Sequence, residues 1–270
     1  IKQIQNGNYM SFVPTYQLGP IPLGDWTQNF QDLGYAADGV TNEFQWMGLR
    51  IVEFDKETKQ EVWSWDPFEH FTMDDYDLYG GTWWVAYIHL KFDWMHTNAF
   101  HFDEEESVIY VSHRHLSRIS KISYPSGEVI WNMGLPAEFN TGDQNICTDL
   151  LFSFQHHIQM LDDGDLLFFD NGNLSQMLLG DPLPISRARR IRVIDDSYCE
   201  TVWQYDLPQN LYGSSMGSVQ LLENGNYFIC TLGDVGGWES SIIEITPEND
   251  MVWKLTVEDF IPLYRAYKIP

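Results

Sequence analysis

Histidines and arginines gather at the ends of predicted strands in this strongly acidic chain. His96 and His156 stand where the first strand begins in two successive sequence units, and we interpret them as an equivalent pair. Arg114 and Arg187 stand at strand ends on the same side. Imidazole acts as a base or nucleophile near neutral pH, and guanidinium forks bind planar oxyanions such as sulfate, phosphate or carboxylate. The four residues therefore predict chemistry on an oxyanion.

Other polar side chains fall at the same strand ends. We predict that they bind substrate, and they are Asn98, His115, Asn171 and His157. A lone histidine in such a loop is more often a hydrogen-bonded structural group, so the catalytic role is predicted from the two paired positions together. A metal bound by His96, His156 and a carboxylate such as Asp170 is the less favoured alternative, since no carboxylate set has ligand spacing. We predict neither a metal nor a cofactor.

The elements that position these residues repeat four times along the chain. Each unit has a glycine- or acid-tipped hairpin, an alternating strand and a strand that closes on tryptophan: Val62-Trp63, Ile130-Trp131, Val202-Trp203 and Val252-Trp253. A period of roughly 50 to 70 residues with four short strands per unit is typical of propeller blades. We predict an all-β fold, a β-propeller of four-stranded antiparallel blades in a single domain over residues 1–270. The blades are expected at about 1–66, 94–134, 154–206 and 215–256.

Loop lengths differ between the two sides of the predicted blades. The links between first and second strands are tight, whereas five other links are long: 14–48, 66–97, 134–156, 171–188 and 206–217. In an antiparallel blade these long links emerge on one side, so one face is elaborated and is expected to carry the function. Short helices are expected only in inserts such as 67–79 or 258–263.

Composition excludes several classes of partner. A formal net charge of −24 disfavours nucleic acid and anionic membranes, which bind through lysine and arginine. No apolar stretch of about 20 residues could span a membrane. Cys147, Cys199 and Cys230 have no CxxC spacing, and both one disulfide with a free thiol and three buried thiols stay open. The chain starts at Ile1 inside a predicted strand, so we expect a fragment or a trimmed chain. The sequence predicts no oligomeric state.

The strand-end motifs resemble the arylsulfotransferase family, the bacterial aryl-sulfate sulfotransferases and their wider relatives. The matching phrases run in family order to the end of the chain, at residues 93–98, 111–122, 127–131, 154–156, 169–172, 186–187, 217–226 and 264–267. The resemblance implies a six-bladed propeller with its site in the central channel, so about four blades would be visible here. It also implies a periplasmic or extracellular location.

The resemblance further implies a ping-pong reaction between an aryl sulfate donor and a phenol. A histidine nitrogen takes the sulfuryl group and then passes it on. On this basis His156 is the expected nucleophile, His96 the base or oxyanion donor, and Arg114 and Arg187 the cations that stabilise the transferring group. One departure matters: a further family histidine is expected at 213–217, where this chain reads Gly-Ser-Ser-Met-Gly. Another histidine of this chain takes that role, or a segment upstream of Ile1 supplies the histidine, or the chain has a different function.

Two other functions remain open at this stage. Residues 55–63 loosely resemble the tryptophan-docking repeats of quinone-dependent dehydrogenases, although the irregular repeat and the histidine-rich face count against that class. A non-catalytic propeller could instead bind glycans or proteins. Its stacking platforms would be Trp83, Trp84 and Trp94.

Overall fold

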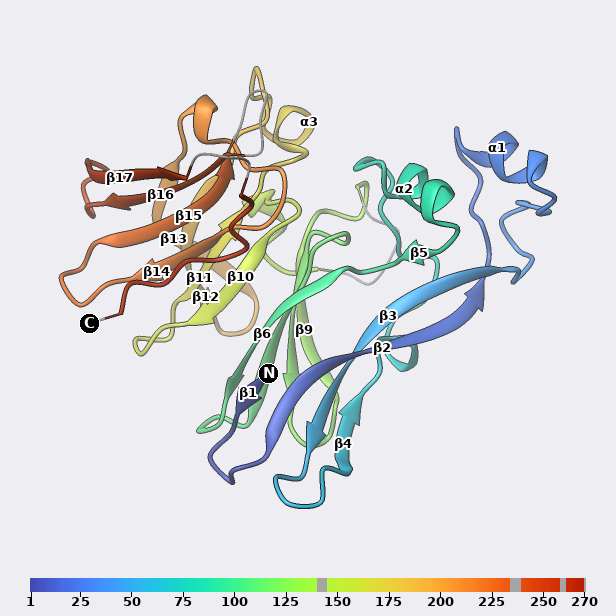
Figure 1. The fold of residues 1–270 in the computed structure, drawn as a ribbon, viewed down its shortest axis with the longest axis horizontal. Coiled ribbons are helices and arrows are strands. Elements are labelled where there is room, and N and C mark those ends of the chain that lie inside the picture. Colours follow the sequence, from blue (N-terminus) through green and yellow to red (C-terminus); the bar gives the residue numbers. More distant parts are fainter. Residues whose placement is uncertain (140–144, 234–238, 258–260, 270) are drawn as a thin grey trace.

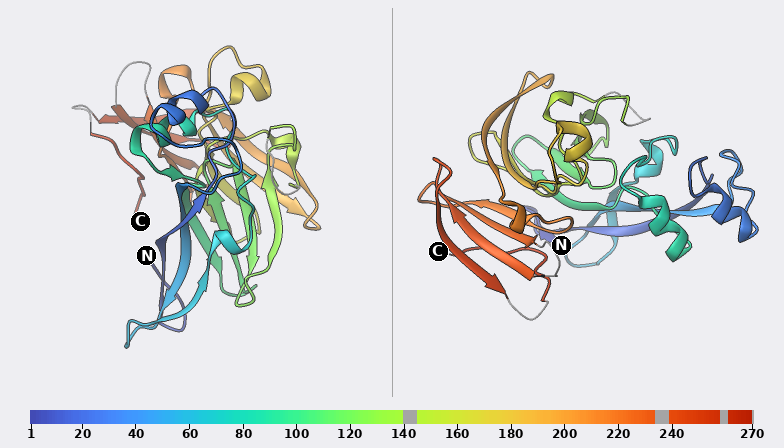
Figure 2. Two further views of the ribbon diagram at one scale, coloured as in Figure 1. Left: turned by 90° about the vertical axis from the view of Figure 1, so that its right-hand side faces the viewer. Right: turned by 90° about the horizontal axis from the view of Figure 1, so that it is seen from above.

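Four antiparallel sheets make up most of the molecule. The structure is a computed structural model and describes residues 1–139, 145–233, 239–257 and 261–269. Each sheet contains four strands that pair in chain order, and the first sheet has a short fifth strand beside them. The sheets follow one another in space as they do along the chain, like the blades of a propeller (Figures 1 and 2). The predicted fold class, a β-propeller of four-stranded antiparallel blades, is confirmed.

The first sheet differs most from the sequence prediction. Its strands are β1 (Lys2–Gln3), β2 (Tyr9–Gly19), β3 (Phe44–Phe54) and β4 (Glu61–Trp65). β2 and β3 remain paired as far as Gly19 and Phe44, so both ends of the predicted loop 14–48 are strand. The pairing extends because Phe44 and Trp46 on β3 are buried in the core. A short parallel strand, β5 (Phe92–Asp93), pairs with the same end of β3.

The other three sheets match the predicted strands closely. The second contains β6 (Thr97–Asp103), β7 (Val108–His113), β8 (Arg118–Ser123) and β9 (Val129–Gly134). The third contains β10 (His156–Met160), β11 (Leu166–Asp170), β12 (Arg187–Ile194) and β13 (Tyr198–Asp206). The fourth contains β14 (Ser218–Leu221), β15 (Tyr227–Gly233), β16 (Glu239–Ile245) and β17 (Met251–Val257).

The helices lie in the long links and gather at one end of the sheets (Figure 1). They are α1 (Thr27–Asp32), α2 (Thr82–His89), α3 (Ser175–Leu179) and the 3-10 turns η1 (Pro67–Glu69), η2 (Thr148–Leu150) and η3 (Gln209–Leu211). The helix expected within 67–79 is only the turn η1, and the longer α2 begins after Gly81, whose φ is +76°. Of the segment 258–263, residues 258–260 lie outside the described residues. None of the described helices is long and apolar enough to cross a membrane.

The repeated tryptophans fasten each sheet to the next. In each case the indole N–H of a fourth strand donates to the hairpin between the third and fourth strands of the following sheet. The three bonds are Trp63 to the Pro125 carbonyl (2.8 Å), Trp131 to Asp196 Oδ1 (2.6 Å) and Trp203 to the Pro247 carbonyl (3.1 Å). An indole buries a large apolar area and still needs a partner for its N–H, so tryptophan suits this position. The sequence repeat therefore records the contacts between blades.

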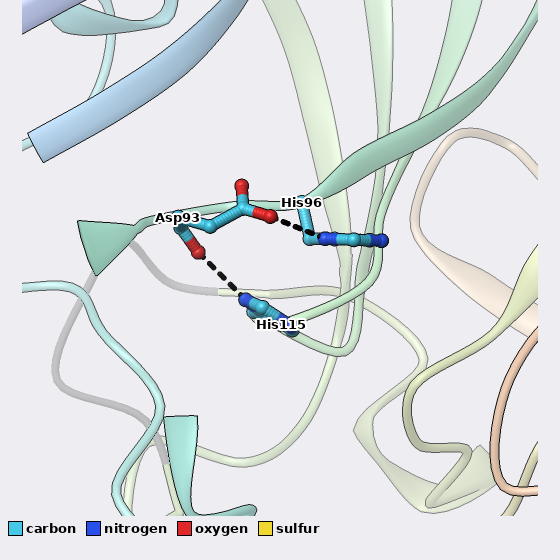
Figure 3. Close-up of side chains that lie close together, drawn as sticks. All are labelled: Asp93, His96 and His115. Atoms are coloured by element: carbon cyan, nitrogen blue, oxygen red, sulfur yellow. Dashed lines mark hydrogen bonds and ion pairs between the residues drawn. The ribbon is translucent and has the colours of Figure 1, made fainter. Parts of the chain in front are cut away.

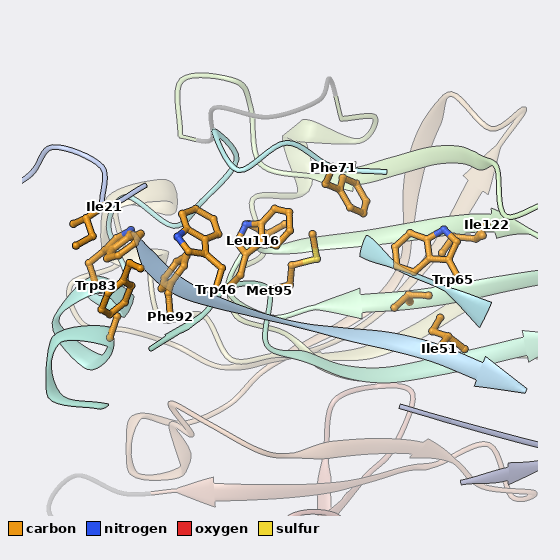
Figure 4. Close-up of a cluster of buried hydrophobic side chains, with 14 of the residues drawn as sticks. Ile21, Trp46, Ile51, Trp65, Phe71, Trp83, Phe92, Met95, Leu116 and Ile122 are labelled. Carbon is orange, nitrogen blue, oxygen red and sulfur yellow. The ribbon is translucent and has the colours of Figure 1, made fainter. Parts of the chain in front are cut away.

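A cluster of aromatic side chains fills the space between α2, β3 and the loop before β6 (Figure 4). Trp83 stacks on Phe92 with ring centroids 4.0 Å apart, and Trp94 donates its indole N–H to the Asp75 carbonyl at 2.5 Å. Trp83 and Trp94 are fully buried. The prediction that they form exposed stacking platforms was wrong, because both rings belong to this core. Trp84 alone of the three is exposed.

A disulfide joins the second and third sheets. Cys147, in the link after β9, is bonded to Cys199 on β13, and Cys230 is a buried free thiol. Burial raises the pKa of Cys230 to about 12. Of the two cysteine states that the sequence left open, the structure has one disulfide and one thiol.

Candidate functional site

His156 begins β10 and its ring is held by Asn171, which follows β11. The His156 Nδ1 and Asn171 Oδ1 atoms are 2.7 Å apart. The Asn171 amide NH2 donates to the carbonyls of Gly213 and Met216, at 2.6 and 3.0 Å, so its oxygen must face the imidazole. His156 therefore carries its proton on Nδ1. Within the described residues, the hydrogen bonds of this ring run through Nδ1, which leaves the Nε2 lone pair for chemistry.

Burial and nearby cations keep His156 neutral. Burial, helped by the charges of Arg114, His96 and Arg265, lowers the pKa of His156 to about 3. Burial also lowers the pKa of Arg114, to about 10, so its guanidinium stays charged at neutral pH. A neutral imidazole beside two arginines is a nucleophile next to a site that favours anions.

Both arginines have hydrogen-bonding capacity to spare. Arg114 lies over the Phe154 ring, 4.7 Å from its centroid, and donates through Nη2 to the Ser214 carbonyl. Arg265 donates through Nη2 to the Asn98 carbonyl at 2.7 Å. The Nε groups of both arginines are buried without a hydrogen-bond partner. Unpaired buried donors are costly, and an anionic ligand would satisfy them.

Asp93 fixes the rings of two further histidines (Figure 3). Its carboxylate Oδ2 lies 2.5 Å from His96 Nδ1, and its main-chain carbonyl accepts a hydrogen bond from His115 Nδ1 at 2.7 Å. The two imidazoles are 4.7 Å apart between ring centroids. Burial lowers the pKa of His115 well below its usual value, with help from the charge of Arg114. Burial alone would raise the pKa of Asp93, but the hydrogen bond and charge of His96 outweigh it and lower the pKa.

Three other predicted site residues are engaged in structural contacts. Asn98 donates to the Gln155 carbonyl at 2.7 Å, which ties β6 to the loop before β10. His157 accepts from the Val219 N–H and lies 2.9 Å from the Tyr267 hydroxyl, so it joins β10 to the fourth sheet and the C-terminal segment. Arg187 is paired with two carboxylates. These are Asp181 at 2.7 Å and Asp206 at 3.2 Å.

His96 and His156 do not occupy equivalent backbone positions. A non-glycine residue with positive φ precedes the first strand of the second, third and fourth sheets, at His96 (46°), Phe154 (59°) and Met216 (59°). The residue two places later is Asn98, His156 or Ser218. His96 therefore corresponds to Phe154, and the predicted pairing of His96 with His156 was wrong by two residues. The bulges after Thr97 and His156 hide this offset from the sequence.

The segment where a further histidine was expected instead supports its neighbours. Ser214 offers its carbonyl to Arg114, and Met216 offers its carbonyl to Asn171. Ser218, which matches His156 in backbone position, accepts the Ala266 N–H at 3.2 Å and so binds the C-terminal segment. This part of the fourth sheet therefore holds the arginine and the asparagine in place through its main chain.

Arg265 and Asp93 were missed as candidate site residues. Both lie within phrases that carried the family resemblance, Tyr264-Arg265-Ala266-Tyr267 and Asp93-Trp94-Met95-His96. An acid three residues before a histidine in a loop was a usable signal. No signal in the sequence indicated the contact of Arg265 with Asn98, because 167 residues separate them in the chain.

Replacing Asn171 with alanine should allow the His156 ring to adopt either neutral tautomer. Without the amide oxygen, the Nδ1 proton has no fixed acceptor and the ring is expected to populate both neutral tautomers. The 15N chemical shifts of the imidazole measure this directly. Asn173→Ala is the matched control, because Asn173 donates to the neighbouring Ser214 carbonyl from the same loop. An unchanged Nδ1–H tautomer in Asn171→Ala would contradict the assigned role of Asn171.

The family model described as Arylsulfotransferase (ASST) matches residues 38–268, which is most of the chain. The chain belongs to the arylsulfotransferase family. No curated protein matches the sequence.

Several solved structures are similar to this arylsulfotransferase family member in fold alone. A protein of unknown function from Bacteroides caccae is 13% identical with a TM-score of 0.40, covering 76% of this chain and 53% of that one. A streptogramin B lyase is 14% identical with a TM-score of 0.41, covering 78% and 48%. A virginiamycin B lyase from Staphylococcus aureus is 12% identical with a TM-score of 0.39, covering 92% and 61%. The chain thus spans about half to three fifths of the length of these structures.

Proposed function

We propose that this chain transfers a sulfuryl group from an aryl sulfate donor to a phenolic acceptor through His156. The observation that carries the proposal is the state of His156: a buried, neutral imidazole with its proton fixed on Nδ1 and two arginines beside it. Family membership supports the same general chemistry. The donor and acceptor classes come from the family resemblance.

The reaction proceeds in two displacements at sulfur. His156 Nε2 attacks the sulfur atom, an N–S bond forms, and the S–O bond to the aryl group breaks with release of a phenolate. The acceptor oxygen then attacks the same sulfur, the N–S bond breaks, and the phenol proton passes to a base. His96 is that base, because its Nδ1 is held by Asp93 and its Nε2 is left to accept a proton.

Arg114 and Arg265 bind the sulfuryl oxygens in this scheme. Charge spread over those oxygens during transfer is stabilised by fixed cations, and such electrostatic terms are usually the largest in catalysis. Arg187 was predicted for the same role. Its pairing with Asp181 and Asp206 favours a structural role at the start of β12 instead.

A periplasmic or extracellular location is part of the proposal. The Cys147–Cys199 disulfide supports it, because disulfides persist mainly in oxidising compartments. The net charge of −24 supports small-molecule partners over nucleic acid.

A turnover assay tests the function. The purified chain is incubated with p-nitrophenyl sulfate, with and without phenol, and p-nitrophenol release is followed by absorbance. We expect release to depend on phenol and phenyl sulfate to accumulate in equal amount. Release that is independent of phenol, with free sulfate as the product, would indicate a hydrolase and contradict the proposal.

A further inference from the structure

Asp93 brings two imidazoles together through both of its oxygen-bearing groups. The carboxylate contacts His96 Nδ1 and the main-chain carbonyl contacts His115 Nδ1, so both Nδ1 atoms face the same residue (Figure 3). One ligating atom from each of Asp93, His96 and His115 lies within 4.8 Å of the others. Within the described residues, Asp93, His96 and His115 form the one group of at least three histidine, cysteine or acidic side chains whose ligand atoms lie this close together.

We propose that Asp93, His96 and His115 bind one divalent transition-metal ion. Two imidazole nitrogens and a carboxylate oxygen suit zinc, copper, nickel or cobalt better than magnesium or calcium, which prefer oxygen ligands alone. In this structure a proton on each Nδ1 bridges to an oxygen of Asp93. A metal ion would take the place of the proton between His96 Nδ1 and the carboxylate, and that proton would move to His96 Nε2. The ligand atoms, which already lie within 4.8 Å of one another, would then close around the ion to bonds of about 2.0–2.2 Å.

The surroundings allow an ion to enter from one side. The side chains of His96 and Asp93 are 42% and 28% exposed, whereas His115 is buried against the Phe154 ring. The charge of Arg114 opposes a cation here. Its guanidinium is engaged by the Ser214 carbonyl and the Phe154 face, and the carboxylate of Asp77 lies close enough to act on it. The carboxylates of Asp77 and Asp93 therefore offset two of the three positive charges that Arg114 and a divalent ion bring together.

A metal on Nδ1 would change what His96 does in the channel. Without a metal, Nδ1 carries the proton and Nε2 accepts one. With a metal on Nδ1, the neutral ring must carry its proton on Nε2, which then donates to an anionic oxygen. The ion would convert His96 from a base into an oxyanion donor. This consequence rests on the proposed function, whereas the metal site itself does not.

Metal titration of the purified chain tests the site. Zn²⁺ is titrated by calorimetry and Co²⁺ by its visible absorption, without any aryl sulfate present. We expect one ion per chain. The affinity for the ion should be at least about 10- to 100-fold lower in His96→Gln and in Asp93→Asn. His89→Gln, which removes an exposed histidine on α2, is the matched control and should bind as the unmodified chain does.

Two results would overturn the metal site: no stoichiometric binding of either ion, or equal affinity in His96→Gln, Asp93→Asn and the control. His96 is half-exposed, so its variant is expected to fold, and thermal unfolding of each variant checks this. His156→Ala separates the two proposals. It should keep the metal and lose the transfer. If the unmodified chain binds the metal but shows no sulfuryl transfer, that result counts against the proposed function alone.

Discussion

Replacing His156 with alanine should lower phenol-dependent turnover of p-nitrophenyl sulfate by about 1,000-fold or more. The ring supplies the atom that forms the covalent bond, and neither arginine can take its place because a guanidinium is not a nucleophile at neutral pH. Burial keeps the imidazole neutral, with a pKa of about 3, so the reactive form is present across the neutral range. The initial rate at saturating donor is the measurement.

The fold should survive this change, which makes the loss interpretable. His101→Ala is the matched control, because His101 is a half-buried histidine on β6 outside the site. Its turnover should stay within a few-fold of the unmodified chain. Turnover in His156→Ala equal to that of the control would remove His156 from the mechanism.

Replacing Asp75 with alanine should destabilise the chain by about 3–5 kcal/mol. Asp75 forms a salt bridge with Arg118, and their side chains are 1% and 0% exposed. Arg118 also lies over the Phe71 ring and donates to Asn145 Oδ1 at 3.1 Å. The pair joins the insert before β6 to β8, and its loss leaves a buried cation without its counter-charge. Denaturant unfolding measures the effect.

Two further variants isolate the cause of that loss. Removing both charges in Asp75→Ala with Arg118→Met should recover much of the stability, since no unpaired charge is then left in the core. Lys121→Ala breaks the more exposed pair with Asp196, 3.0 Å apart, and should cost less than about 1 kcal/mol. A cost below about 1 kcal/mol for Asp75→Ala would contradict the assigned role of the buried pair.

The blades could be predicted because their signals are local. Hairpin turns, alternating strands and the closing tryptophans each lie within a few residues, and the indole contacts between sheets repeat with them. The long pairing of β2 with β3 could not be read from the residues between 14 and 48, because burial of Phe44 and Trp46 by α2 and its loop decides it.

The candidate site was predicted only in part, since its geometry depends on contacts far apart in the chain. His96 and Arg114 act on the pKa of His156, so these three predicted residues lie near one another. Bulges in β6 and β10 hid the offset between the two histidines. Arg187 is an arginine at a strand end, as a residue that binds an anion would be. Its neutralising partners, Asp181 and Asp206, come from a loop and from β13, and no spacing rule identifies them.

The most direct test of the account is a single-turnover experiment without an acceptor. Mixing the chain with p-nitrophenyl sulfate alone should release about one equivalent of p-nitrophenol in a burst and leave a sulfuryl group on the peptide that contains His156. Adding phenol should then remove the group as phenyl sulfate. Steady release without a burst, or a modified peptide that lacks His156, would contradict the central claim that this imidazole carries the sulfuryl group.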